Sequence, residues 1–195
     1  MIAAIVLAAG ASRRFGAQKL LAELHGKPVI RWTVEHMCDT DVDDVIVVVG
    51  RERDRVRESL DGLSVRFVVN EQFASGLSAS MRAGVHALTA DASAAIIALG
   101  DQPTVGCSVV DSLIESYRRT GKPIVAPHYR GVRGNPVLFD ASLFSELGSV
   151  LGDFGARELI GRDPARVATV ELECDAPEDV DTVEELERLA EKWVS

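Results

Sequence analysis

The chain has 195 residues, of which 47% are hydrophobic and 26% charged, and its formal net charge at pH 7 is −9. These values are ordinary for one globular domain, and no apolar run reaches the length of a membrane span. Residues 171–191 hold ten acids and one base, and the rest of the chain is neutral, which gives no basic face for nucleic acid. The three cysteines are far apart, and the amino terminus lacks the pattern of a signal peptide, so we expect a cytoplasmic protein.

Strand-like and helix-like segments alternate along nearly the whole chain. Continuous apolar runs predict strands at residues 2–7, 45–49, 65–69, 94–99, 124–126, 136–139 and 167–172. Apolar residues at helical spacing predict helices within residues 28–37, 52–60, 77–88, 109–117 and 183–193. This alternation indicates a mostly parallel sheet covered by helices on both faces. Ligands of such sheets bind beyond the carboxyl ends of the strands, so polar residues at those ends are the candidate site.

The segment that follows the first strand is the most informative. Residues 7–19 read Leu-Ala-Ala-Gly-Ala-Ser-Arg-Arg-Phe-Gly-Ala-Gln-Lys, and no acid precedes Glu23. Small residues let a ligand approach the backbone, and uncompensated cations suit a polyphosphate. The segment is neither a Walker A loop nor a dinucleotide fingerprint, because it lacks the required glycine spacings. It predicts a phosphate-binding loop, and an ordinary turn with solvated arginines is the alternative.

Two acidic segments hold candidate ligands of a divalent cation. Asp101 follows the predicted strand 94–99, and Asp179 and Asp181 precede the last predicted helix. One or two carboxylates together with phosphate oxygens and water suffice for Mg²⁺. The alternatives are structural: Asp101 begins a helix or turn, and Asp181 or Thr182 forms a capping box with a glutamate of the first helical turn.

A third candidate block lies at the start of the predicted helix 77–88. Asn70 follows the predicted strand 65–69, and Gly76, Ser78 and Ser80 lie where the helix begins. Hydroxyls and free N–H groups at a helix start can hold base edges or anionic oxygens. Helix capping by a serine is the alternative.

The last candidate block contains two arginines. Arg133 and Asn135 lie in a glycine-rich stretch, and Arg157 follows a second one. A guanidinium can bind a phosphate monoester through two parallel hydrogen bonds. Surface salt bridges are the alternative for both arginines.

Together these blocks resemble the MobA-like nucleotidyltransferase family over nearly the full chain. The resemblance implies one domain over residues 1–195, a three-layer α/β/α Rossmann-like sandwich of the nucleotide-diphospho-sugar transferase type, and Mg²⁺ as the cofactor. It implies catalytic roles for Arg14, Lys19 and Asp101. It implies metal binding by Asp101 and, from the similarity of residues 179–182 to the family's Asp-x-Asp-Thr element, by Asp181, with Asp179 as the alternate. It implies nucleotide binding by Leu7, Ala8, Ala9, Gly10, Ala11, Ser12, Arg13, Asn70, Gly76, Ser78 and Ser80. It implies acceptor binding by Arg133, Asn135 and Arg157.

The resemblance also implies a reaction. An NTP donates its nucleoside monophosphate to a small phosphorylated acceptor, with Arg14 and Lys19 holding the β- and γ-phosphates. Leu-Ala-Ala-Gly is similar to the cytidylyl members, whereas a glycine in place of Ala9 resembles the guanylyl ones. We therefore expect CTP rather than GTP, with the Ala9 methyl group narrowing the base pocket.

The resemblance implies molybdopterin as the acceptor, and with it transient contact with a molybdenum enzyme. Sugar phosphates and polyol phosphates are the alternative acceptors. The alternative of another class is a non-catalytic nucleotide-binding maturation factor for a molybdenum enzyme. The presence of both Asp101 and Asp181 disfavours it, because a pure binder needs neither.

Overall fold

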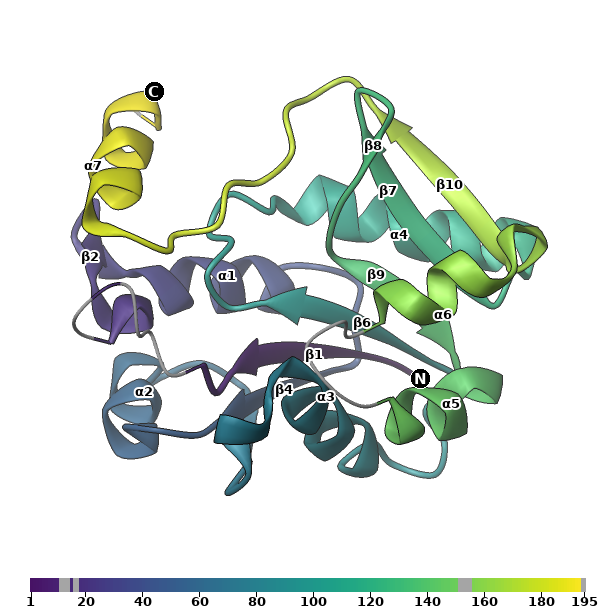
Figure 1. Ribbon diagram of the computed structural model, residues 1–195, viewed down its shortest axis with the longest axis horizontal. Helices are drawn as coiled ribbons and strands as arrows, with labels where there is room; N and C mark the ends of the chain where they lie inside the picture. Colours follow the sequence, from purple (N-terminus) through teal and green to yellow (C-terminus); the bar gives the residue numbers. More distant parts are fainter. Residues whose placement is uncertain (11–14, 16–17, 151–155, 194–195) are drawn as a thin grey trace.

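The central feature of the computed structural model is a mixed sheet with helices on both sides (Figure 1). The structure describes residues 1–10, 15, 18–150 and 156–193. In this part of the chain the sheet has eight strands in the order β10-β7-β9-β6-β1-β4-β5, with β8 paired to β7. Their bounds are β1 (Ile2–Ala8), β4 (Asp44–Val49), β5 (Arg66–Val69), β6 (Ala94–Leu99), β7 (Ile124–Tyr129), β8 (Val132–Arg133), β9 (Val137–Asp140) and β10 (Val167–Leu172). A separate hairpin contains β2 (Glu23–Leu24) and β3 (Lys27–Pro28).

Helices cover both faces because strand side chains point alternately to either side. On one face, Ala4 and Val6 share an apolar core with α1 (Val29–Cys38), α2 (Arg53–Ser59) and α4 (Cys107–Thr120). On the other face, Ile5 and Leu7 share a core with α3 (Leu77–His86), α5 (Phe144–Ser149) and α6 (Arg157–Arg162). Short 3₁₀ turns span Lys19–Leu21, Phe73–Ser75, Ala141–Leu143 and Pro164–Arg166. The predicted three-layer α/β/α sandwich with a mostly parallel sheet is confirmed.

The order of the strands reverses between β1 and β6. β1 pairs in parallel with β4 on one side and with β6 on the other. The chain proceeds from β1 to β4 and β5 and then returns to β6 across β1. Leu7 pairs with Leu99, so the loops after β1 and β6 leave the sheet at the same point. A reversal of this kind is where ligands bind in open α/β sheets.

The last helix, α7 (Val183–Lys192), packs away from the sheet. After β10 the chain crosses back to the side of the molecule where α1 and β2 lie (Figure 1). A third apolar core fixes α7 there, and its fully buried members include Leu24, Val29 and Val180. Trp32 of α1 and Trp193, just after α7, pack against it, with ring centroids 4.9 Å apart. This core places the acidic segment that precedes α7 beside the sheet reversal.

The predicted strands agree with the observed ones to within a few residues, and the short elements are the difference. β2, β3, β8, α5 and α6 were not predicted, because segments of two to six residues carry too little periodicity. α2 begins at Arg53 rather than at Glu52, whose φ of 56° is left-handed. None of the helices in the described part of the chain combines the length and apolar character that a membrane span needs.

Candidate active site

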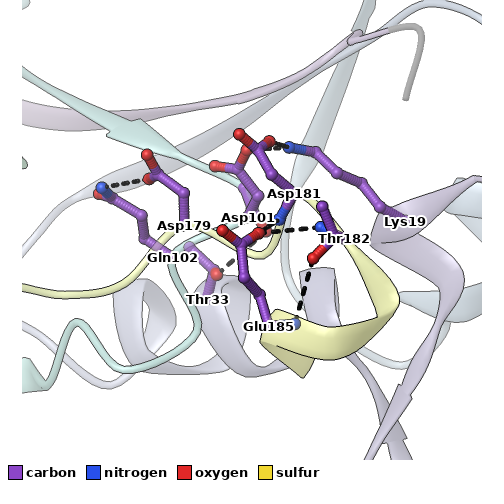
Figure 2. Close-up of polar contacts among 9 residues, drawn as sticks. Lys19, Thr33, Asp101, Gln102, Asp179, Asp181, Thr182 and Glu185 are labelled. Atoms are coloured by element: carbon purple, nitrogen blue, oxygen red, sulfur yellow. Dashed lines mark hydrogen bonds and ion pairs between the residues drawn. The ribbon is translucent and has the colours of Figure 1, made fainter. Parts of the chain in front are cut away.

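Lys19 and two aspartates meet at the carboxyl ends of β1 and β6. Lys19 Nζ lies 2.5 Å from Asp101 Oδ2 and 2.6 Å from Asp181 Oδ1 (Figure 2). Only 13% of the Lys19 side chain is exposed, against 20% for Asp101 and 24% for Asp181. The three residues come from positions that are 82 and 162 residues apart in the chain. The structure therefore brings together three of the residues that the sequence selected for chemistry.

Asp101 is held in place by the residue before it. The Gly100 N–H donates to the Leu7 carbonyl at 3.1 Å, and the buried Thr33 hydroxyl of α1 donates to the Gly100 carbonyl at 3.2 Å. A Cβ at Gly100 would lie 2.7 Å from Ile30 Cδ1 and 3.1 Å from the Leu7 oxygen, so a side chain there would push this turn away. The helix-cap alternative for Asp101 is wrong, because α4 begins after Gly106, whereas the turn alternative is correct, because Asp101 lies in the turn that follows β6.

Asp181 is positioned by the start of α7. The Thr182 hydroxyl accepts from the Glu185 N–H at 3.2 Å, and the Glu185 carboxylate accepts from the N–H groups of Thr182 and Asp181 at 2.9 Å. This is a capping box, as one of the two interpretations of the sequence predicted. Thr182 is its cap residue, which leaves the Asp181 side chain to face Lys19. The capping and the site interpretations thus apply to different residues of one segment.

A third carboxylate, Asp179, lies beside this pair and has a different partner. Its Oδ1 accepts from Gln102 Nε2 at 2.7 Å (Figure 2). Burial raises the pKa of Asp179, and the neighbouring negative charge of Asp101 raises it further. Gln102 is 5% exposed, and its Oε1 has no hydrogen-bond partner among the described residues. Gln102 and Thr33 were not predicted from the sequence. The position of Gln102 directly after Asp101 could have indicated that it belongs to the site, whereas Thr33 has no such signal.

The electrostatics of the site are dominated by its carboxylates. Burial alone lowers the pKa of Lys19, but the ion pairs with Asp101 and Asp181 outweigh it, and the pKa is raised. Lys19 therefore stays protonated. The donors also suit a hard divalent cation, because two carboxylates aim at one position. Among the described residues no group of three or more His, Cys, Asp or Glu surrounds a common point, so further ligands would come from phosphate and water.

The side chains at the end of β1 and directly after it are buried up to Gly10. Leu7, Ala8 and Ala9 are 7%, 1% and 2% exposed, and Gly10 is exposed. The Ala9 methyl group packs in the core shared with α3, and this burial disfavours the expectation that the methyl group narrows the base pocket. A Cβ at Gly50 would lie 2.9 Å from the Ala9 oxygen, so Gly50 permits this close packing. Four predicted nucleotide-loop residues lie outside the described residues: Ala11, Ser12, Arg13 and Arg14.

The Asn70 block runs from the end of β5 to the first turn of α3, and its Asn70, Ser78 and Ser80 side chains are buried. Asn70 Nδ2 donates to Ser80 Oγ at 3.0 Å, and Asn70 Oδ1 accepts from the Gln72 N–H at 2.9 Å. Ser78 and Ser80 are 1% and 5% exposed. The cap residue is Gly76, with a φ of 95° and no side-chain cap bond, so the serine-capping alternative is wrong. The structure gives Asn70 and Ser80 a role in shaping this turn.

The three predicted acceptor residues line one cavity. Arg133, Asn135 and Arg157 surround a space of about 340 Å³, together with Gly134, Val137 and Ile160. Val137 of β9 pairs with Ile97 of β6, so the cavity opens at the same sheet edge as Asp101. Neither arginine forms an ion pair with a residue that the structure describes, so the salt-bridge alternative is wrong for this part of the chain. Both guanidinium groups are thus available to an anion.

Comparisons with known proteins show which proteins this chain resembles. The profile of the MobA-like NTP transferase domain matches residues 4–169. Nicotine blue oxidoreductase of Paenarthrobacter nicotinovorans is 31% identical over 96% of this chain and 96% of its own. A probable molybdenum cofactor guanylyltransferase of Thermococcus gammatolerans is 32% identical over 64% of this chain and 61% of its own. The crystal structure of Rv0371c from Mycobacterium tuberculosis in complex with manganese superposes with a TM-score of 0.84, at 28% identity over 97% of this chain and 98% of that one.

Proposed function

Because the chain belongs to the MobA-like NTP transferase family, we propose that it is a single nucleotidyltransferase domain that transfers a nucleoside monophosphate from an NTP to a small phosphorylated acceptor. The observation that carries the proposal is the convergence of Lys19, Asp101 and Asp181 at the reversal of strand order. A related structure contains manganese, which supports a divalent cation, and we propose Mg²⁺.

The proposed reaction needs positioning and charge neutralisation more than covalent chemistry. A phosphate oxygen of the acceptor forms a bond to the α-phosphorus, the bond from that phosphorus to the bridging β-phosphate oxygen breaks, and pyrophosphate leaves. Lys19 and Arg14 would hold the β- and γ-phosphates. A divalent cation on Asp101 and Asp181 would neutralise charge that develops on the phosphates.

The proposed nucleotide contacts lie in two segments. Backbone groups of Leu7–Gly10, with Ala11, Ser12 and Arg13, would bind the triphosphate and sugar, while Gly76, Asn70 and the serines of α3 would support the base. We propose CTP as the donor, supported by the resemblance of Leu-Ala-Ala-Gly to the cytidylyl members. A relative named as a guanylyltransferase makes GTP the necessary comparison.

The cavity that Arg133, Asn135 and Arg157 line supports a phosphate-bearing acceptor. We propose molybdopterin, because one relative is named for the molybdenum cofactor. A sugar or polyol phosphate could bind the same two guanidinium groups. We also propose brief contact with a molybdenum enzyme that receives the product. The three cysteines are free thiols, which supports a cytoplasmic location.

An oxidoreductase is the second candidate, because nicotine blue oxidoreductase is 31% identical over 96% of both chains. A non-catalytic nucleotide-binding factor is the third. Neither of these two functions explains why two carboxylates and a lysine converge where the strand order reverses.

Pyrophosphate release separates the three candidates. Thermal shift with CTP, GTP, ATP and UTP would first identify the nucleotide, and release would then be measured with molybdopterin, a sugar phosphate and a polyol phosphate. We expect acceptor-dependent pyrophosphate with CTP and Mg²⁺. Stabilisation by a nucleotide without pyrophosphate from any acceptor would favour the binding factor, and oxidation of NADH or NADPH with a dye acceptor would favour the oxidoreductase.

A further inference from the structure

We propose that Lys19 acts as an internal counter-ion that keeps the Asp101–Asp181 pair closed to a divalent cation until a triphosphate draws the lysine away. The inference rests on the proposed function, because it concerns the same two carboxylates. It adds an order of events: nucleotide and divalent cation bind together, and the cation binds weakly to the free protein.

The geometry places one ammonium where a metal ion would need both carboxylates. Lys19 Nζ contacts Asp101 Oδ2 at 2.5 Å and Asp181 Oδ1 at 2.6 Å, so each aspartate already uses one oxygen. Both side chains are at least three-quarters buried. A second cation brought to the same pair would be repelled by the ammonium in a site with little water to screen it. Lys19 and a divalent cation therefore compete.

The chain around Lys19 allows the side chain to leave while its backbone stays. Lys19 begins a 3₁₀ turn, and the next residue, Leu20, is 3% exposed in the core under α1 and α2. The Ala22 N–H donates to the Lys19 carbonyl at 3.1 Å. The four-carbon stem of a lysine can swing the ammonium from this fixed point. The residues that precede Lys19 are those of the proposed phosphate loop, so a bound triphosphate would offer the ammonium another anionic partner.

The charges of the neighbouring groups show why the site needs a counter-ion when no metal is bound. Asp101 and Asp181 both contact the Lys19 ammonium, whereas Asp179 accepts from the neutral amide of Gln102 at 2.7 Å. Without Lys19, Asp101 and Asp181 would lose the ammonium that lies between them. Such an arrangement destabilises the folded state unless another cation enters.

The test is the affinity of Mn²⁺ for the nucleotide-free protein, measured by calorimetry and by electron paramagnetic resonance. Lys19→Met removes the charge and keeps the stem, and Lys19→Arg keeps the charge. Lys27→Met is the matched control. Lys27 Nζ lies 2.6 Å from Glu35 Oε2 and does not contact the aspartates of the site. We expect Lys19→Met to bind Mn²⁺ about tenfold or more tightly than the parent, with Lys19→Arg and Lys27→Met within about threefold of it. Adding Asp101→Asn to Lys19→Met should abolish the gain.

Thermal unfolding gives a second readout and covers the case in which Lys19→Met folds poorly. We expect the variant to be less stable than the parent in metal-free buffer and to recover with Mn²⁺, and Lys19→Gln should behave in the same way. Loss of stability in both variants without recovery would mean that the lysine is structural only. Unchanged or weaker Mn²⁺ affinity in Lys19→Met overturns the inference and leaves the proposed function intact if the parent releases pyrophosphate. Absence of Mn²⁺ binding in every variant, with or without CTP, overturns both.

Discussion

The backbone N–H of Val180 donates a 3.0 Å hydrogen bond to the carbonyl oxygen of Asp101, and this bond ties the segment before α7 to the end of β6. The Val180 side chain is fully buried in the third apolar core. Its neighbours Asp179 and Asp181 therefore stand on either side of an anchored residue. One face of the segment supplies stability and the other supplies carboxylates to the site.

The cap of α7 should accordingly affect both stability and the site. Thr182→Ala removes the hydroxyl that accepts from the Glu185 N–H, and loss of such a cap costs about 0.5–2 kcal/mol of folding free energy. We also expect weaker activation by Mg²⁺, because Asp181 precedes the cap and would lose its fixed position. Chemical denaturation and the Mg²⁺ dependence of turnover measure the two effects. The matched control is Thr120→Ala at the far end of α4, which should leave the Mg²⁺ dependence unchanged.

Asp101→Asn tests the central carboxylate. The substitution keeps the size of the side chain and removes its charge, so we expect a folded protein whose turnover falls by about 100-fold or more. Circular dichroism checks the fold, and pyrophosphate release checks turnover at saturating Mg²⁺. Asp179→Asn is the comparison, because Asp179 bonds to Gln102 rather than to Lys19, and its loss should be milder. Activity of Asp101→Asn within threefold of the parent would contradict the assignment.

Much of this fold follows from periodicity, whereas its finest placements do not. Buried runs such as those of β1 and β6 have one stable arrangement, a parallel pair inside a sheet, so their carboxyl ends could be predicted to meet. The family resemblance from residues 7–19 is confirmed by the profile match over residues 4–169. The convergence of Lys19 on Asp101 could be expected from the same reasoning, since both follow adjacent strands.

Other features depend on contacts that have no local signal. The sequence Asp-Val-Asp-Thr is compatible with a cap or with a site, and only the packing of Val180 decides which side chain serves which purpose. Ala9 follows a strand, and nothing nearby in the chain reveals that its methyl group packs into the core beside Gly50. The bond between Gln102 and Asp179 joins residues 77 apart, which periodicity cannot predict.

The arginine-lined cavity predicts a separation of kinetic effects. Arg133→Ala and Arg157→Ala remove guanidinium groups that would bind the acceptor phosphate, so we expect the KM for the acceptor to rise about tenfold or more. The KM for the nucleotide should change less than about threefold, because neither arginine lies at the β1 loop. Arg118→Ala is the control. Arg118 of α4 forms an exposed ion pair with Asp41, and its loss should change neither constant. Equal rises in both constants would place the arginines at the nucleotide instead.

The link between α4 and β9 predicts a loss of stability at high pH. The Tyr117 hydroxyl donates to Asp140 Oδ2 at 2.6 Å, and burial together with this carboxylate raises the pKa of Tyr117 to about 12. An unfolded tyrosine has a pKa of about 10, so above that pH the unfolded chain releases a proton that the folded protein retains. Stability from this group is complete below pH 10 and is lost as the pH rises to about 12. Denaturant unfolding between these values should show a smaller decline in Tyr117→Phe than in the parent.

The choice of base provides a test that separates the sequence hypothesis from the structure. If the Ala9 methyl group narrowed the base pocket, Ala9→Gly would raise the use of GTP relative to CTP by about tenfold or more. In the structure Ala9 is 2% exposed and packs in the core with α3, so we expect the ratio of kcat/KM for the two nucleotides to change by less than about threefold. The substitution should instead lower the free energy of unfolding by about 1 kcal/mol, because a buried methyl group is lost. The ratio of kcat/KM for CTP and GTP would be measured in the parent and in the variant with one acceptor, alongside denaturant unfolding of both proteins. A large shift toward GTP with unchanged stability would show that the methyl group faces the nucleotide after all.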